Sequence, residues 1–225
     1  MQLDMSTFDE VGFARSDRPL SDAALLEIEP LFAALGIAKA GHRLLPPSKL
    51  SGLSAIGSIT NEIASRIGMN ARPVRALLFD KHRHNNWALG WHQDRTIEVR
   101  ARIDTTGYGP WTIKAGRQHV APPIALLEAM MTVRIHLDEV DAANAPLLVA
   151  PRSHCLGLVP ERDIAAVVAR CGTTACLAQR GHVWLDSTPI LHASDAASNP
   201  RHRRVLQIDF AATALPNGLE SAALD

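Results

Sequence analysis

The order of hydrophobic periodicities along the chain is the feature that most restricts its fold. Two stretches with helical spacing, residues 21–35 and 50–67, come first, and from residue 74 onward most apolar residues fall in short runs of strand length. Only brief helical patterns, at 124–130 and 164–169, interrupt those runs, so the regular strand–helix alternation of a parallel sheet is missing. We therefore expect a mainly β fold with flanking α-helices, either a sandwich or a jelly roll.

The two early helices have recognisable ends and apolar stripes. The first follows Ser21, a favourable N-cap, and ends at Gly36, although Pro30 lacks an amide hydrogen and should bend it. The second helix is closed by Gly68. The side chains expected to face the core are Leu25, Ile28, Phe32 and Leu35 in the first helix and Leu53, Ile56, Ile63 and Ile67 in the second.

Short apolar or alternating runs predict the strands. These runs are residues 74–79, 96–103, 131–137, 147–149, 181–185, 190–192 and 203–212. Residues 107–123 are rich in Gly and Pro, and a loop of that length in a compact domain is typical of a functional lid.

Composition narrows the class of protein. The 225 residues fit one domain, 1–225, and 47% hydrophobic residues provide ample core material. The 23 basic and 23 acidic side chains cancel, which argues against nucleic-acid and membrane partners and favours a small-molecule substrate. The first ten residues lack a signal-peptide pattern, and the three cysteines form no CxxC pair. We expect a soluble cytoplasmic protein.

Two His-x-Asp pairs are the candidate metal ligands. In an extended segment, residues two apart project from the same face, so His92 with Asp94, or His136 with Asp138, could approach one ion together. With His192 as a third ligand, either pair would form the two-histidine, one-carboxylate triad of non-haem Fe(II) sites.

Position favours the first pair. His92 lies in a turn-prone stretch between aromatic residues, whereas His136 falls in a regular alternation of strand type. His82 and His84 imitate the His-x-His of cupins, but no Glu follows before Glu98, and a solvated loop explains them as well. The clustered Cys and His spacing of tetrahedral zinc sites does not occur, so iron is the expected metal.

Several blocks together resemble the phytanoyl-CoA dioxygenase family of Fe(II)- and 2-oxoglutarate-dependent oxygenases. The matching blocks are Leu78-Phe79-Asp80-Lys81, Asn86-Trp87, Trp91-His92-Gln93-Asp94-Arg95-Thr96, Arg134-Ile135-His136-Leu137-Asp138, Pro151-Arg152-Ser153-His154, His192-Ala193-Ser194 and Arg203-Arg204-Val205-Leu206. The resemblance covers about residues 79–211. It implies a double-stranded β-helix, a cupin-like jelly roll.

The resemblance also implies a chemistry. It places the metal ligands at His92, Asp94 and His192, with Fe(II) as cofactor and 2-oxoglutarate and molecular oxygen as co-substrates. The expected reaction hydroxylates a small molecule and releases succinate and carbon dioxide. Halogenating relatives replace the carboxylate ligand, so the presence of Asp94 favours hydroxylation. The chain departs from the family at Ala145 and Arg152, where glycines are usual.

An arginine should hold the far carboxylate of 2-oxoglutarate, because a guanidinium can bind it through two parallel hydrogen bonds. Arg203 and Arg204 are both candidates. Arg203 shares a strand face with Gln207 and Asp209, which is the more polar face and should look inward, and the family places its arginine there. Ser194 is expected to add a hydroxyl.

The remaining expectations concern the substrate side. Candidate substrate or lid residues are Trp91, Trp111, Lys114, His119, Arg134 and His136. Core packing is the alternative for the aromatics, solvation for the lysine, and an internal bonded pair for Arg134 and His136. Two other functions stay open: a non-catalytic jelly-roll binding module, and a cupin-type metalloenzyme that does not use 2-oxoglutarate. Acyl-CoA recognition is not expected, since no concentrated basic patch is present.

Overall fold

The computed structural model describes residues 5, 7–33, 41–43, 50 and 52–222. Its helices are α1 (Phe8–Val11), α2 (Asp22–Ile28), α3 (Ser54–Ile67), α4 (Ile124–Glu128) and α5 (Ile164–Cys171), with 3-10 turns η1 (Glu29–Phe32), η3 (Ser153–Leu156) and η4 (Glu161–Asp163). Its strands are β1 (Phe13–Arg15), β2 (His42–Arg43), β3 (Arg72–Lys81), β4 (Leu89–His92), β5 (Ile97–Val99), β6 (Trp111–Lys114), β7 (Arg117–Val120), β8 (Met131–His136), β9 (Leu147–Val149), β10 (Thr174–Cys176), β11 (Val183–Ser187), β12 (His192–Ser194) and β13 (Arg203–Ala211).

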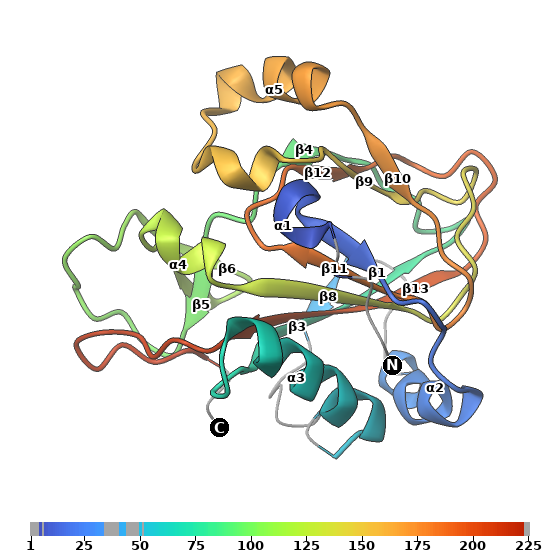
Figure 1. Ribbon diagram of the computed structural model, residues 1–225, viewed down its shortest axis with the longest axis horizontal. Coiled ribbons are helices and arrows are strands. Elements are labelled where there is room, and N and C mark those ends of the chain that lie inside the picture. The colour runs from blue at the N-terminus through green and yellow to red at the C-terminus, as the bar shows by residue number, and fades with distance from the viewer. Residues whose placement is uncertain (1–4, 6, 34–40, 44–49, 51, 223–225) are drawn as a thin grey trace.

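Antiparallel sheets form the body of the molecule. A six-stranded sheet has the order β1-β11-β8-β13-β3-β2, and a four-stranded sheet has the order β10-β9-β12-β4. In Figure 1 the larger sheet crosses the middle of the molecule, with the smaller sheet on one side of it and α2 and α3 on the other. The mainly β fold with flanking helices is therefore confirmed. Within the described part of the chain, no helix combines the length and apolar character of a membrane crossing.

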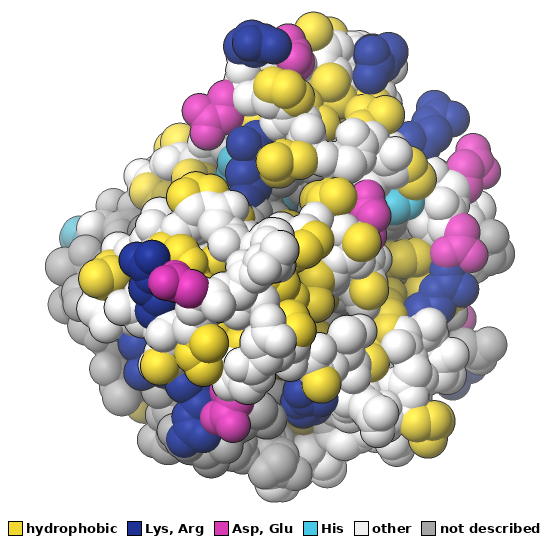
Figure 2. All heavy atoms as spheres, turned by 90° about the vertical axis from the view of Figure 1, so that its left-hand side faces the viewer, with side chains coloured by type: hydrophobic (Ala, Val, Ile, Leu, Met, Phe, Trp, Pro, Cys, Tyr) yellow, Lys and Arg dark blue, Asp and Glu magenta, His cyan; other side chains and the backbone are white. Residues whose placement is uncertain are grey.

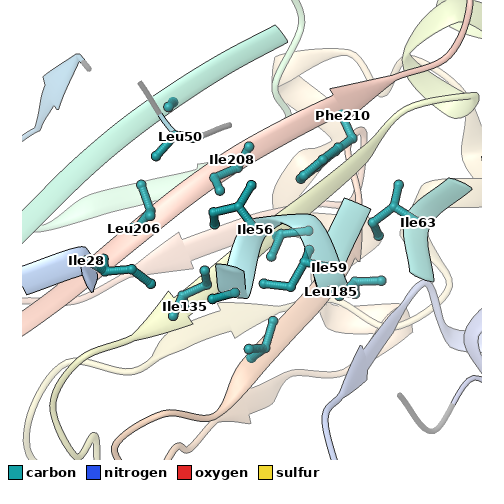
Figure 3. Packing of buried hydrophobic residues seen from close by; sticks show 14 of the residues in the cluster. Ile28, Leu50, Ile56, Ile59, Ile63, Ile135, Leu185, Leu206, Ile208 and Phe210 are labelled. Carbon is teal, nitrogen blue, oxygen red and sulfur yellow. The ribbon is translucent and has the colours of Figure 1, made fainter. Parts of the chain in front are cut away.

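The main hydrophobic core lies between the larger sheet and the two early helices. Figure 3 shows isoleucines of α2 and α3 packed against side chains of β8, β11 and β13. The fully buried members include Ile28, Ile56, Ile59, Ile63, Ile135, Leu185, Leu206, Ile208 and Phe210. Burying each such side chain contributes roughly 1.5–3 kcal/mol. Because strand side chains alternate, the opposite face of β13 is left to point between the two sheets.

The first helix follows its expected start. The Ser21 hydroxyl accepts a hydrogen bond from the Ala24 amide at 3.3 Å, which caps α2. The α-helix ends at Ile28 and is followed by the 3-10 turn η1 with Pro30 at its beginning, so the regular α-helix stops before the proline. The predicted end at Leu35 and Gly36 lies outside the described residues.

The second helix is shorter than predicted at its start. It begins at Ser54, because Leu53 has extended backbone angles, and it closes at Gly68 as expected. Ile59, which was not in the predicted stripe, is fully buried. Of the predicted stripe, Ile56 and Ile63 are buried, and Leu53 and Ile67 are partly buried against the same core.

The predicted lid loop contains a β-hairpin. Within residues 107–123, β6 and β7 pair antiparallel and join β5 in a three-stranded sheet. Ala115 and Gly116 form the turn, and both have positive φ, as a two-residue hairpin turn requires. The glycines and prolines of this stretch obscured the alternation of its two short strands. Of the predicted strand 96–103, only Ile97–Val99, which is β5, forms a strand.

Candidate active site

A cavity of about 200 Å³ lies between the two sheets and is lined by six of the twelve predicted site residues. It is lined by the inward side chains of β3 and β13 on one side and by β4 and β12 on the other. The lining residues that bear on the chemistry are Arg75, Lys81, Trp87, His92, Asp94, Arg134, His192, Ser194, Arg203 and Gln207.

His92 and His192 face each other across this cavity. Strands β4 and β12 are antiparallel neighbours, and their register places His192 directly opposite His92, with ring centroids 4.3 Å apart. In each ring Nδ1 lies within hydrogen-bond distance of a carbonyl two residues earlier, that of Gly90 at 2.8 Å and that of Ile190 at 2.9 Å. A histidine that donates through Nδ1 in this way presents the lone pair of Nε2, which is the arrangement common in metal ligands.

The environment of His192 favours its neutral form. Burial, helped by the charge of Arg134, lowers the pKa of His192 to about 3. An imidazole must be neutral to bind a metal, so His192 needs no deprotonation near neutral pH.

Asp94 lines the same cavity but is engaged by an arginine. Its Oδ2 atom accepts a hydrogen bond from Nη2 of Arg75 at 3.0 Å, and the Nε atom of Arg75 also pairs with Asp209. Burial alone would raise the pKa of Asp94, but the charge of Arg75, with a smaller contribution from His192, holds it well below its usual range. The carboxylate is therefore ionised.

These donors fit a metal ion in chemical type, and one of them requires a rotation. Two neutral imidazoles and one carboxylate are the donor set of a non-haem Fe(II) site. Among the residues that the structure describes, no three His, Cys, Asp or Glu side chains are already grouped closely enough to hold an ion. The Asp94–Arg75 pair accounts for this, because the carboxylate is directed to the guanidinium and would have to turn toward the two rings.

Arg203, Ser194 and Lys81 form a second polar group in the cavity. Nη1 of Arg203 donates to the Ser194 hydroxyl at 3.2 Å, and Nζ of Lys81 donates to the same oxygen at 2.8 Å. Within the described residues, Nε of Arg203 has no hydrogen-bond partner although it is buried. Burial lowers the pKa of Arg203, and repulsion from Arg134 lowers it further, to about 10. The guanidinium therefore keeps its charge near neutral pH. This group is suited to a carboxylate.

Lys81 has an environment unusual for a lysine. Its side chain is fully buried, contacts the Trp87 ring at 5.0 Å and donates to the Asp195 carbonyl at 2.7 Å. Burial, with repulsion from Arg203, lowers its pKa to about 7. An anion bound beside it would favour the charged form.

Arg204 and Asp138 belong to the opposite face. Arg204 donates to the Asp138 carboxylate through Nε at 2.9 Å and through Nη2 at 2.7 Å. Asp138 is therefore occupied outside the cavity. His136 is buried in the interior, and within the described residues neither of its ring nitrogens has a hydrogen-bond partner. Arg134 pairs with Asp186 and Gln207, not with His136 as one expectation had it.

Of the six predicted substrate or lid residues, five lie away from the cavity lining and Arg134 belongs to it. Trp91 packs against the cluster under α5, and Trp111 packs beside β5 and α4 with Arg102 over its ring at 5.5 Å. His119 is buried and contacts Arg43 at 3.1 Å, so it has a structural environment. Lys114 is exposed at the end of the hairpin.

Three residues of the site were not predicted from the sequence. Arg75 and Lys81 share the inward face of β3, and the alternation Arg75-x-Leu77-x-Phe79-x-Lys81 is the signal that could have indicated them. Gln93 lies between His92 and Asp94 and points the other way. It is buried and bonds three backbone groups, those of Gly157, Pro189 and Val159.

Solved structures share this architecture. Iron-bound EctD from S. alaskensis superposes with a TM-score of 0.68 at 17% identity, covering 92% of this chain and 75% of that one. HygX from Streptomyces hygroscopicus with iron bound gives 0.64 at 12% identity, with 93% and 85% covered. AviO1 from Streptomyces viridochromogenes Tue57 gives 0.61 at 18% identity, with 94% and 95% covered. No family model matches the chain, and no curated protein matches its sequence.

These likenesses extend over nearly the whole chain and concern the fold. Together with the two facing antiparallel sheets, they show that the chain has a jelly-roll fold of the double-stranded β-helix type. The fold predicted from the sequence is therefore confirmed.

Proposed function

We propose that this protein is an Fe(II)- and 2-oxoglutarate-dependent dioxygenase that hydroxylates a small molecule and releases succinate and carbon dioxide. The observation that carries the proposal is the pair of opposed rings of His92 and His192, each tied through Nδ1, in one cavity with the ionised Asp94. Structures of the same fold support it: EctD and HygX were solved with iron, and HygX also with nickel and 2-oxoglutarate.

His92, Asp94 and His192 would hold the metal. Bound Fe(II) would supply the activation of dioxygen, so that one oxygen atom enters the substrate as a hydroxyl and the other enters succinate, while C1 of 2-oxoglutarate leaves as carbon dioxide. The protein orients the ligands, because the carbonyls of Gly90 and Ile190 hold both imidazoles; Arg75 would keep Asp209 as its partner if Asp94 held the metal.

Arg203, Ser194 and Lys81 would bind the far carboxylate of 2-oxoglutarate. Nε of Arg203 has no hydrogen-bond partner among the described residues and is free to donate to a carboxylate. The buried ammonium of Lys81 and Nη1 of Arg203 both donate to the Ser194 hydroxyl. Arg204 is a poorer candidate, because Asp138 already satisfies it. None of these residues needs to act as a general base, and their contribution is to bind and orient the co-substrate.

The direct test uses purified protein with Fe(II), ascorbate and 2-oxoglutarate, and measures succinate. We expect slow uncoupled turnover, which His92→Ala and Asp94→Ala reduce to the rate given by free Fe(II). His84→Ala removes an exposed histidine outside the cavity and serves as the matched control. The ligand assignment would be wrong if His136→Ala and Asp138→Ala lost bound iron while His92→Ala retained it.

Calorimetry separates the two other functions. A non-catalytic binding module would bind neither Fe(II) nor 2-oxoglutarate, and a cupin-type metalloenzyme would bind the metal alone. Binding of both, with 2-oxoglutarate dependent on the metal, is expected here. The cytoplasmic location stays a prediction.

A further inference from the structure

We propose that the β6–β7 hairpin binds an anionic group of the substrate, a carboxylate, with Lys114 as its main contact. This inference rests on the proposed function, and it names a class of substrate for it. It starts from the charged side chains on the hairpin side of Asp94.

Three alternate positions along one segment, Asp94, Thr96 and Glu98, each contact cations. Arg75 pairs with Asp94 at 3.0 Å, Nζ of Lys114 donates to the Thr96 hydroxyl at 2.9 Å, and Glu98 pairs with both Arg43 and Arg117. At the middle position, Thr96, the cation Lys114 therefore contacts a neutral hydroxyl and not a carboxylate. Within the described residues, that hydroxyl is the hydrogen-bond partner of the ammonium.

Metal binding would leave this side of the site with excess positive charge. If Asp94 turns to the ion, Arg75 keeps Asp209 as its partner. Arg43 and Arg117 already pair with one carboxylate, Glu98, whose side chain is only 3% exposed, and Lys114 has the neutral Thr96 hydroxyl as its partner. His119 does not add a positive charge to this group, because burial lowers its pKa and favours the neutral imidazole.

Lys114 lies outside the cavity lining but contacts the segment that carries Asp94. Thr96, which it contacts, is two residues from Asp94. Partial burial lowers the pKa of Lys114, attraction by Asp94 opposes this, and repulsion by Arg75 and Arg43 adds to the lowering. An anion beside Lys114 would relieve the repulsion.

Apolar side chains lie near Thr96, the residue that Lys114 contacts. Thr96 and Glu98 also line a small cavity of about 30 Å³ whose other walls include Leu126, Leu127 and Met130. Figure 2 shows the corresponding side of the molecule, where hydrophobic side chains gather in the middle and Lys and Arg side chains lie around them. A carboxylate attached to an apolar body fits such a surface.

A pair of probes that differ in charge alone tests the proposal. Cyclohexanecarboxylate and cyclohexanecarboxamide are titrated into full-length protein with Zn(II) as a diamagnetic stand-in for Fe(II) and a slight molar excess of 2-oxoglutarate, and binding is followed by saturation-transfer NMR. We expect the carboxylate to bind roughly 3- to 10-fold more tightly than the amide, as one partly exposed charged contact would give. Lys114→Gln should remove most of that preference, and Lys114→Arg should retain it.

The control variant is Arg162→Gln, which removes an exposed cation far along the chain, with an 85% exposed side chain, and makes the same change in net charge. It should keep the preference. Equal binding of the two probes, or none by either, would overturn the proposal, as would a preference that Lys114→Gln leaves intact. Succinate formation by the unaltered protein is measured separately, so failure of the proposed function is distinguishable from failure of the anion site.

Discussion

Two adjacent arginines on β13 have opposite surroundings, although both were candidates for the same role. Arg203 points into the cavity toward Ser194, while Arg204 points to the other face and binds Asp138. Alternation along a strand decides this, and it was readable from the more polar face of residues 203–209. The binding of 2-oxoglutarate by Arg203 stays a prediction.

We expect Arg203→Leu to weaken 2-oxoglutarate binding roughly 10- to 100-fold, the value of a lost hydrogen-bonded charge pair. Arg204→Leu should leave that affinity unchanged and lower the free energy of unfolding by about 1 kcal/mol, because its ion pair is partly exposed. Anaerobic calorimetry of the metal-loaded variants and urea unfolding measure the two effects. The opposite pattern would assign the carboxylate to Arg204.

Ala145 and Arg152, where the resembled family usually has glycine, both adopt left-handed backbone angles, with φ of 51° and 67°. A side chain in this conformation costs roughly 1–2 kcal/mol. Both positions therefore have a backbone conformation that favours glycine, although neither residue is a glycine.

Arg152→Gly and Ala145→Gly should each stabilise the protein by roughly 0.5–1 kcal/mol, since part of the relieved strain is offset by the greater freedom of glycine in the unfolded chain. Urea unfolding measures this. Ala150→Gly, at a buried position without a positive φ, is the control and should destabilise. A loss of stability in both test variants would show that neither position is strained.

At the scale of elements, the site depends on how β4 is held. Gln93 joins the ligand segment to two distant loops, because its amide nitrogen donates to the carbonyls of Gly157 and Pro189 and its oxygen accepts from the amide of Val159. The residue between the two ligands is thus the anchor that fixes their direction.

Gln93→Leu should lower the free energy of unfolding by about 2–4 kcal/mol, because three buried backbone groups lose their partners. It should also weaken metal binding roughly 10-fold or more, as loss of a supporting contact does. Chemical unfolding and metal titration test the two parts. Gln118→Leu, on β7, provides the comparison, and an unchanged metal affinity in Gln93→Leu would show that β4 is held in place without this side chain.

At the scale of the whole molecule, the interior buries charged groups beside a neutral histidine, His136. His136 is buried there without a hydrogen-bond partner among the described residues. Burial, together with the charges of Arg203 and Arg134, lowers its pKa to about 3 from the ordinary 6.5. The folded protein therefore keeps His136 neutral while the unfolded chain protonates it.

This difference predicts the direction of acid instability. Above pH 6.5 neither state binds the proton, and the stability is fully present. As the pH falls from 6.5 toward 3, His136 is protonated in the unfolded chain but not in the folded protein. The free energy of unfolding therefore falls by as much as roughly 1.4 kcal/mol per pH unit because of His136. In that pH range, His136→Leu should reduce the slope of the unfolding free energy against pH by up to roughly 1.4 kcal/mol per pH unit, which corresponds to one proton. Equal slopes in the two proteins would contradict the assignment.

The sequence by itself determined the two early helices, seven of the thirteen strands in the described part of the chain and the facing of side chains along β13. Periodicity gave the two helices and most strands, and it put Arg203 on the inward face, because alternation is a local property of the chain. It did not reveal the hairpin β6–β7, whose strands are short and flanked by Gly and Pro.

Only the tertiary structure decided which residues meet. His92 and His192 face each other because β4 and β12 pair in one particular register, and Asp138 is withdrawn from the cavity by Arg204. Arg75 and Lys81 reach the site because β3 pairs with β13 in the facing sheet. Register between distant strands is set by the packing of the whole chain and by the closure of its loops, which no local pattern of residues records.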